Sequence, residues 1–113
     1  GQEPPARVWR RLHGGDGAGN RVQVELRSES TVWVSVAGTL SAEGAERLAG
    51  DLVNGLRRRK ERLVLDLERI VKTEAAALDR LAEHLRAYRD RIRIVLPEAG
   101  ELATLAMLFA IYR

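Results

Sequence analysis

Leu63-Val64-Leu65-Asp66-Leu67 is the stretch that decides the fold of this chain. A nearly continuous apolar run of this length is typical of a β-strand that is covered on both faces, which places it inside a sheet. The segment between Gly38 and this run is long enough to contain a helix, so we expect a right-handed βαβ connection. Strands connected in this way are parallel.

Two further strands are predicted before this unit. Apolar and polar residues alternate over residues 21–26, which indicates a strand with one exposed face. Residues 31–37 are rich in β-branched and aromatic side chains, and we expect Gly38 to end this strand. Because only the short turn Ser28-Glu29-Ser30 separates the two strands, they should pair antiparallel.

Helices are predicted around these strands. Ser41 is placed to cap the first helix, which ends in the basic cluster Arg57-Arg58-Arg59-Lys60. We interpret this cluster as cations that offset the negative end of the helix dipole, in preference to a phosphate-binding patch. A second helix is expected over residues 75–89, a strand over 91–96 and a third helix from Pro97. The sequence therefore predicts an α/β fold with a mixed sheet, an N-terminal antiparallel hairpin followed by parallel strands, and helices packed on the sheet.

Composition excludes several classes of protein. With 113 residues, 45% of them apolar and 31% charged, the chain is typical of one globular domain. It has no cysteine and two histidines, so we expect no disulfide, no metal site and no cofactor. No apolar run approaches the roughly 20 residues of a membrane span, so no membrane insertion is expected. The net charge is +3, and apart from Arg57-Arg58-Arg59-Lys60 the basic and acidic residues are interspersed, so we expect no nucleic acid partner.

Residues 1–20 differ in composition from the rest of the chain. Pro4-Pro5 and the glycine-rich run at residues 14–20 are typical of a flexible extension, with a short edge strand at residues 7–12 between them. The first residues lack the basic start and apolar core of a secretion signal, so we expect a cytoplasmic location.

From residue 21 onward, the order of elements and three motifs resemble the STAS domain, the module of anti-sigma factor antagonists and of the cytoplasmic tails of sulfate transporters. Val34-Ser35-Val36-Ala37-Gly38-Thr39-Leu40-Ser41 is similar to the family's strand and Gly-x-Leu-Asp turn, and residues 63–67 to its central strand. Where the family typically has Asp-Ser-Ser-Gly-Leu, this chain has Glu74-Ala75-Ala76-Ala77-Leu78. The resemblance implies a STAS-like domain over residues 21–113 that lacks the family's last helix.

This loop is where the chain departs from the family. In the antagonists that it resembles, a partner kinase phosphorylates the first serine of the loop, and the added charge releases the partner. Ala75 stands at that position without a hydroxyl, so the resemblance implies a module without this switch. Thr73 is the nearest hydroxyl, and we expect it to cap the helix that begins at Ala75. Glu74 keeps a carboxylate, either to stabilise the helix dipole or to hold a permanent charge on a docking face.

The resemblance also implies a partner-binding surface around this loop and the loop before the first helix. Its candidate residues are Ser41, Lys72, Thr73, Glu74, Ala75, Ala76 and Ala77. The expected function is a bacterial, non-catalytic regulatory protein–protein interaction module of the anti-sigma factor antagonist type, with an anti-sigma factor or kinase-like protein as partner. The alternative is a cytoplasmic STAS domain or subunit that regulates a membrane transporter, either an anion carrier or a lipid ABC system.

No catalytic constellation is predicted. His13 and His84 have no serine or cysteine nucleophile at suggestive spacing. Asp66 stands in an apolar strand, and we interpret its carboxylate as an acceptor for loop N–H groups. An enzyme or nucleotide binder that uses Asp66 and Glu74 ranks last, because these two titratable residues lie at opposite ends of a strand–loop unit. The chain also has no Gly-x-x-x-x-Gly-Lys loop that would favour a nucleotide. Because the resemblance implies that the family's last helix is missing, apolar surface near Phe109, Ile111 and Tyr112 would be bare. Either the domain was excised from a longer protein, or another copy of the chain covers this surface, and we expect a homo-oligomer.

Overall fold

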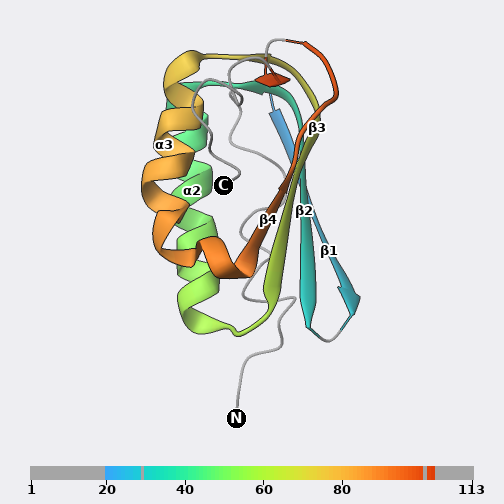
Figure 1. Cartoon of the computed structure of the whole chain (residues 1–113), viewed down its shortest axis with the longest axis vertical. Coiled ribbons are helices and arrows are strands. Elements are labelled where there is room, and N and C mark those ends of the chain that lie inside the picture. Colours follow the sequence, from blue (N-terminus) through green and yellow to red (C-terminus); the bar gives the residue numbers. More distant parts are fainter. Residues whose placement is uncertain (1–19, 29, 101, 104–113) are drawn as a thin grey trace.

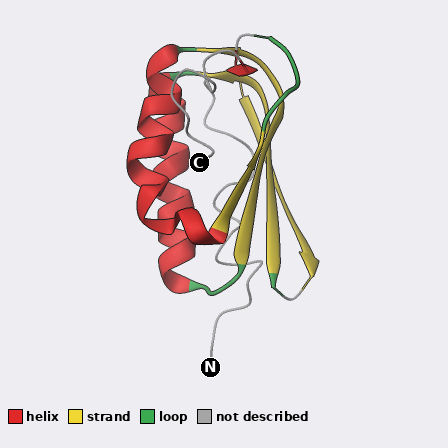
Figure 2. Cartoon of the chain, viewed as in Figure 1, coloured by secondary structure: helices red, strands yellow, loops and turns green. Residues whose placement is uncertain are grey.

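The computed structural model describes residues 20–28, 30–100 and 102–103. The described strands form one sheet in the order β1-β2-β3-β4, with β1 antiparallel to β2 and the other neighbours parallel. Both α-helices lie on one face of this sheet (Figure 2). The α/β fold with a mixed sheet, predicted from the sequence, is confirmed. The elements are β1 (Asn20–Ser28), β2 (Thr31–Leu40), α2 (Ala42–Arg58), β3 (Arg62–Thr73), α3 (Ala75–Leu85), the 3-10 helix η2 (Arg86–Arg91) and β4 (Ile92–Val95).

The apolar run at residues 63–67 lies inside the sheet, with β2 and β4 on its two sides (Figure 1). Leu63, Leu65 and Leu67 are at most 1% exposed. Val64 points to the opposite face, because successive side chains alternate along a strand, and it is only 9% exposed. Burial on both faces explains why this strand is continuously apolar.

One hydrophobic core fills the space between the sheet and the helices. The apolar positions of the helices recur at the expected spacing, so a single stripe of each helix faces the sheet. Each fully buried aliphatic side chain contributes about 1.5–3 kcal/mol relative to an exposed one. The main contributors are Val32, Val34 and Val36 of β2, Leu48, Leu52 and Leu56 of α2, and Leu78 and Leu81 of α3.

The predicted end of the second strand is wrong. β2 continues through Gly38 to Leu40, and β3 likewise runs beyond its apolar stretch to Thr73. Gly38 has a φ of 95°, which glycine adopts without strain, and a shift in the register with β3 follows it directly. The glycine therefore bends the strand locally, and both neighbours continue to pair beyond it.

Asp66 stabilises another irregularity, where the register of β2 and β3 shifts between Ser35 and Ala37. One oxygen of its carboxylate accepts the backbone N–H of Glu68 at 3.0 Å. The other accepts the Nε1–H of Trp33 at 3.3 Å. The interpretation of Asp66 as a structural acceptor is confirmed, although the N–H comes from its own strand and not from a loop.

The second helix ends earlier than predicted. α3 stops at Leu85, and the tighter η2 follows to Arg91. Tyr88 of η2 packs against the core, and the Arg91 guanidinium reaches a backbone carbonyl of α2. The 3-10 turn thus carries the chain across the end of α2 and into β4.

A third helix does not begin at Pro97. Residues 98–100 form bends, and Gly100 has a φ of 103°, which a helix does not admit. Proline fixes its own φ but not the conformation of the residues that follow it, so it cannot carry the helix past this glycine. Among the described residues, helical conformation returns at Leu102 and Ala103, and Leu102 is 2% exposed in the core.

Several expectations fall outside the described residues. They concern residues 1–19 with the strand at 7–12, and the C-terminal residues 104–113. Asn20, which we assigned to the extension, is the first residue of β1. Within the described ranges, no helix has the length and apolar character needed to cross a membrane.

Candidate functional site

The fold brings the two loops of the candidate site to one end of the molecule. β2 and β3 are parallel, and a helix follows each of them, so the amino ends of α2 and α3 lie next to each other. Both lie at the upper end of the molecule in Figure 1. Parallel strands with helical connections always place such loops on the same edge of a sheet.

Ser41 caps α2 as predicted. Its Oγ accepts the backbone N–H of Gly44 at 3.0 Å. Its backbone carbonyl accepts the N–H of Ala45 at 2.9 Å. Ser41 therefore satisfies one otherwise unpaired N–H at the start of the helix, and its side chain is half-buried against that turn.

Glu74 joins the two loops. One oxygen of its carboxylate accepts the backbone N–H of Ala42, the first residue of α2, at 2.6 Å. Its own backbone N–H donates to the carbonyl of Leu40 at 3.0 Å. Glu74 is also the N-cap of α3, although its side chain makes no capping bond to that helix. The carboxylate thus serves the neighbouring helix, a contact that sequence spacing cannot reveal because 32 residues separate the two groups.

Thr73 does not cap α3, so that prediction is wrong. The residue is the last of β3 and is only 4% exposed. Its hydroxyl lies 3.2 Å from the carbonyl oxygens of Leu40 and of Glu74. Because β3 is longer than predicted, the threonine side chain points into the strand pair and cannot reach the helix N–H groups.

The structure separates the predicted site residues into an exposed and a buried set. Lys72, Glu74, Ala75 and Ala76 are exposed, whereas Thr73 is buried and Ala77 is 0% exposed in the core. Thr73 and Ala77 are therefore part of the packing beneath the surface and are not available to a partner. The exposed members, together with the two residues at the start of α2, form what we call the amino-end surface: Ser41, Ala42, Lys72, Glu74, Ala75 and Ala76.

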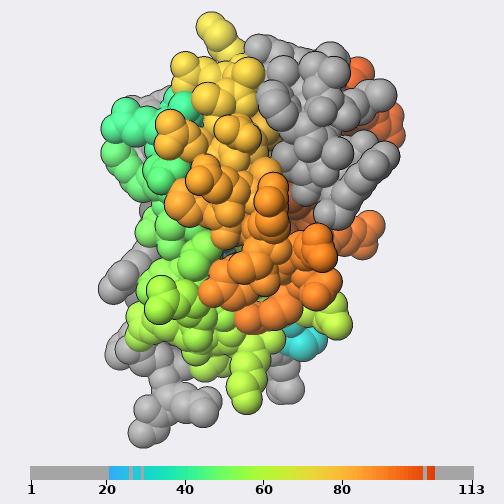
Figure 3. Space-filling model, turned by 60° about the vertical axis from the view of Figure 1, so that its left-hand side comes forward, coloured from blue at the N-terminus to red at the C-terminus, as the bar shows by residue number. Residues whose placement is uncertain are grey.

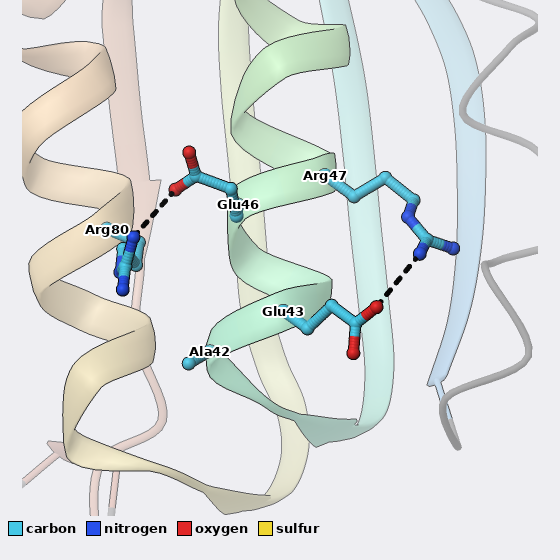
Figure 4. Close-up of a pocket in the computed structure, with 5 residues that line it drawn as sticks. All are labelled: Ala42, Glu43, Glu46, Arg47 and Arg80. Carbon is cyan, nitrogen blue, oxygen red and sulfur yellow. Dashed lines mark hydrogen bonds and ion pairs between the residues drawn. The ribbon is translucent and has the colours of Figure 1, made fainter.

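A shallow hollow of about 480 Å³ adjoins the amino-end surface, and sequence analysis did not identify it. Arg80 of α3 reaches across to Glu46 of α2 at 3.6 Å, and Glu43 pairs with Arg47 at 3.3 Å (Figure 4). The spacing of four residues between Glu43 and Arg47 could have predicted their ion pair from the sequence. The pair between the helices depends on how α2 and α3 pack.

The exposed end of β3 adds an apolar side chain. Val71 is 79% exposed, and it is the one large hydrophobic residue that is exposed among the described residues. It lies beside Lys72, at the second register shift between β2 and β3. A strand irregularity there turns an apolar side chain outward, close to the amino-end surface.

Two of the titratable groups highlighted from the sequence, Asp66 and His84, have structural partners, whereas His13 lies outside the described residues. Asp66 binds Trp33 and the backbone of Glu68, as described above. Nε2 of His84 lies 2.9 Å from Glu46, so the histidine links α3 to α2. No cluster of three or more histidine, aspartate or glutamate side chains able to hold a metal ion occurs within the part of the chain that the structure describes.

Comparisons with known proteins find likeness in structure. No family model matches the sequence, and no curated protein matches it. The anti-sigma factor antagonist SpoIIAA in its unphosphorylated form superposes with a TM-score of 0.62 at 14% identity, over 80% of this chain and 81% of SpoIIAA. An antisigma-factor antagonist STAS domain from Rhodobacter sphaeroides gives 0.55 at 18% identity, over 73% of this chain and 89% of that domain.

A third solved structure, Mglu in its native form, gives a TM-score of 0.54 at 22% identity. The match covers 79% of this chain and 28% of that larger chain. The chain has the fold of a STAS domain.

Proposed function

We propose that this chain is a non-catalytic regulatory module of the anti-sigma factor antagonist type, which binds a protein partner through the amino-end surface. The observation that carries the proposal is the hydrogen bond that the first N–H of α2 donates to the Glu74 carboxylate. This bond connects the loop before α2 with the loop before α3. A surface held in one conformation loses little entropy when a partner binds. The likeness to two antagonist structures supports the same assignment.

We further propose that this module works without phosphorylation in the loop. Ala75 is exposed at the start of α3 and offers no hydroxyl. Thr73 is buried with its hydroxyl on two carbonyls, and the Ser41 hydroxyl caps α2. A kinase needs an accessible hydroxyl, so neither of these residues replaces the missing serine. Partner binding is then regulated by abundance or by the partner itself.

Ala76→Arg tests the proposed surface. Ala76 is exposed in the first turn of α3, so an arginine fits without disturbing the core but blocks close approach of a partner. We expect at least a roughly tenfold loss in partner capture from extracts of the source cells. Ala87→Arg is the matched control, because Ala87 is an exposed alanine of η2, outside this surface. Equal capture by wild type and Ala76→Arg would contradict the proposal.

The identity of the protein that Ala76→Arg fails to capture decides between the two candidate partners. A kinase-like anti-sigma factor supports the antagonist assignment. A permease or a transporter ATPase supports the alternative, a STAS domain or subunit that regulates a membrane transporter. Both the antagonist and the transporter regulator would act in the cytoplasm, and neither function requires a cofactor.

Self-association remains a prediction from the sequence. Sedimentation velocity over a range of concentrations measures it directly. A strictly monomeric species at the highest concentration would contradict a homo-oligomer.

A further inference from the structure

Two short segments hold an unusual share of the basic residues. Residues 57–62 and 86–93 contain nine basic and two acidic side chains, whereas acidic residues outnumber basic ones in the rest of the sequence. The net charge of +3 therefore conceals a strong separation of charge along the chain. The basic members are Arg57, Arg58, Arg59, Lys60, Arg62, Arg86, Arg89, Arg91 and Arg93.

Arg91 brings the two segments together. Its guanidinium donates to the backbone carbonyls of Leu56 at 2.9 Å, Arg59 at 2.7 Å and Glu61 at 3.0 Å. In addition, β3 and β4 pair in register from Leu63 and Ile92 onward, directly after both segments. The yellow-green atoms that follow α2 and the orange atoms of η2 adjoin at the lower end of Figure 3.

Most of the other cations at this end of the molecule face solvent. We call the exposed set the basic pole, and it consists of Arg57, Arg58, Lys60, Arg62, Arg86, Arg89 and Arg93. These residues come from α2, the loop that follows it, β3, η2 and β4. The basic pole lies at the carboxyl ends of α2 and α3, at the other end of both helices from the amino-end surface.

Offsetting the helix dipoles explains only part of this charge. The carboxyl end of a helix carries about half a negative charge, so α2 and α3 together supply about one. Of the two acidic residues, Glu61 is 5% exposed and pairs with Arg59 at 3.1 Å. Asp90 is the exposed one. A large positive excess is left, and it attracts external anionic surfaces.

We propose that the basic pole binds peripherally to an anionic lipid surface. Clusters of four to eight basic residues attract such membranes by about 1 kcal/mol per residue, without insertion and without a shaped pocket. The seven exposed side chains lie at one end of the fold, which suits a flat, fluid surface of phosphate headgroups. This inference goes beyond the proposed protein-binding function, because it uses a different surface and needs no protein partner.

Other anionic partners fit the basic pole less well. Protein interfaces depend on apolar or aromatic anchors, yet the one exposed large hydrophobic residue of the described ranges is Val71, at the far end of β3. Single-stranded nucleic acids stack on exposed aromatic rings, whereas Tyr88, the aromatic residue of η2, packs against the core. Duplex DNA is read by a helix or ribbon that enters a groove, and both helices present their ends here.

Flotation with unilamellar vesicles tests the proposal. We expect the full chain to bind vesicles that contain phosphatidylglycerol and not vesicles of phosphatidylcholine alone. Binding should fall steeply as salt rises from about 50 to about 500 mM, because the Debye length shrinks. The triple variant Arg57→Gln, Arg86→Gln, Arg89→Gln should bind about 100-fold more weakly, from about 1 kcal/mol for each charge removed.

A matched variant separates the basic pole from the overall charge. Arg21→Gln, Arg27→Gln, Arg69→Gln removes the same number of exposed cations outside both surfaces and should retain wild-type binding. Circular dichroism confirms that each variant is folded. Equal losses in the two variants, or equal binding to both vesicle types, would overturn the proposal. Tighter binding to duplex DNA than to the anionic vesicles, lost in the first variant alone, would overturn it in favour of nucleic acid.

Discussion

Glu74 stands at the start of α3, but its side chain serves α2. Its carboxylate accepts the N–H of Ala42, and Ser41 accepts the N–H of Gly44 in the same first turn. Two of the otherwise unpaired N–H groups of α2 are therefore satisfied, one by a local residue and one across the site. A negative charge at this place also meets the positive end of the helix dipole.

Glu74→Ala should lower the free energy of unfolding by about 0.5–2 kcal/mol, the range found for lost helix caps. The reason is that the N–H of Ala42 loses its acceptor. Glu74→Gln keeps an amide oxygen at this position and should lose less. Equilibrium unfolding in urea measures both changes.

Glu83→Ala is the control for this measurement, since Glu83 is an exposed carboxylate of α3. We expect its effect to stay within about 0.5 kcal/mol, as is usual for surface substitutions. If Glu74→Ala costs no more than Glu83→Ala, the bond between the loops does not stabilise the fold.

At the scale of elements, η2 connects the sheet to the end of α2. The last carbonyls of an α-helix have no partner within the helix. Arg91, at the end of η2, donates to the carbonyl of Leu56 in the last turn of α2 and to two carbonyls of the following segment. Its planar guanidinium carries several donors in a fixed arrangement, which suits three acceptors at once.

Arg91→Ala should lower the free energy of unfolding by about 2–3 kcal/mol, because hydrogen bonds to charged groups contribute more than neutral ones and three carbonyls lose their donor. Arg91→Lys should recover less than half of the loss, since an ammonium group cannot reproduce the planar geometry. Urea unfolding monitored by circular dichroism gives both values.

Arg89→Ala provides the comparison within the same element. Arg89 is exposed in η2, and its removal should change stability by no more than about 0.5 kcal/mol. Similar losses for Arg89 and Arg91 would show that charge, and not the three carbonyl contacts, determines the contribution of Arg91.

At the scale of the whole molecule, a single hydrophobic core connects the described strands and α-helices. It includes residues of β1, β2, α2, β3 and α3, and it extends to Leu102. A domain of this size with one core normally unfolds as one unit. Its two surfaces, the amino-end surface and the basic pole, are therefore carried at opposite ends of the helices by one cooperative structure.

Leu65→Ala tests this cooperativity. Leu65 is 0% exposed in β3, and its truncation should cost about 2–5 kcal/mol. In a Trp9→Phe background, the fluorescence of Trp33 on the sheet and the far-ultraviolet circular dichroism of the helices should shift to the same lower urea midpoint. Two separate midpoints would show that the sheet and helices unfold independently.

Val71→Ala is the corresponding control on the same strand. Val71 is 79% exposed, so its truncation removes little buried surface. Its effect should stay within about 0.5 kcal/mol, which is typical of surface positions.

Local patterns in the sequence determined the elements and their arrangement. Alternation in β1, the apolar run of β3 and the helical spacing of Leu48, Leu52 and Leu56 each report which side of an element is buried. The connection through a helix then implied parallel strands, and the short turn implied the antiparallel hairpin. Ser41 was identified as a cap because the N–H group that its hydroxyl oxygen accepts belongs to the helix that it starts.

Element ends and the contacts of the site depended on tertiary structure. From the sequence we assigned a strand end to Gly38, a helix cap to Thr73 and a helix start to Pro97, which are the roles that these residue types prefer locally. Pairing between β2 and β3 extended the first strand past Gly38 and the second as far as Thr73, and the left-handed conformation of Gly100 prevented the expected helix. Contacts between groups that are distant in sequence also depended on the tertiary structure. Glu74 meets Ala42, and Arg91 meets Leu56, only because parallel strands bring their loops to common edges of the sheet. A pattern read along the chain records burial, but it cannot record which distant backbone group a side chain will reach.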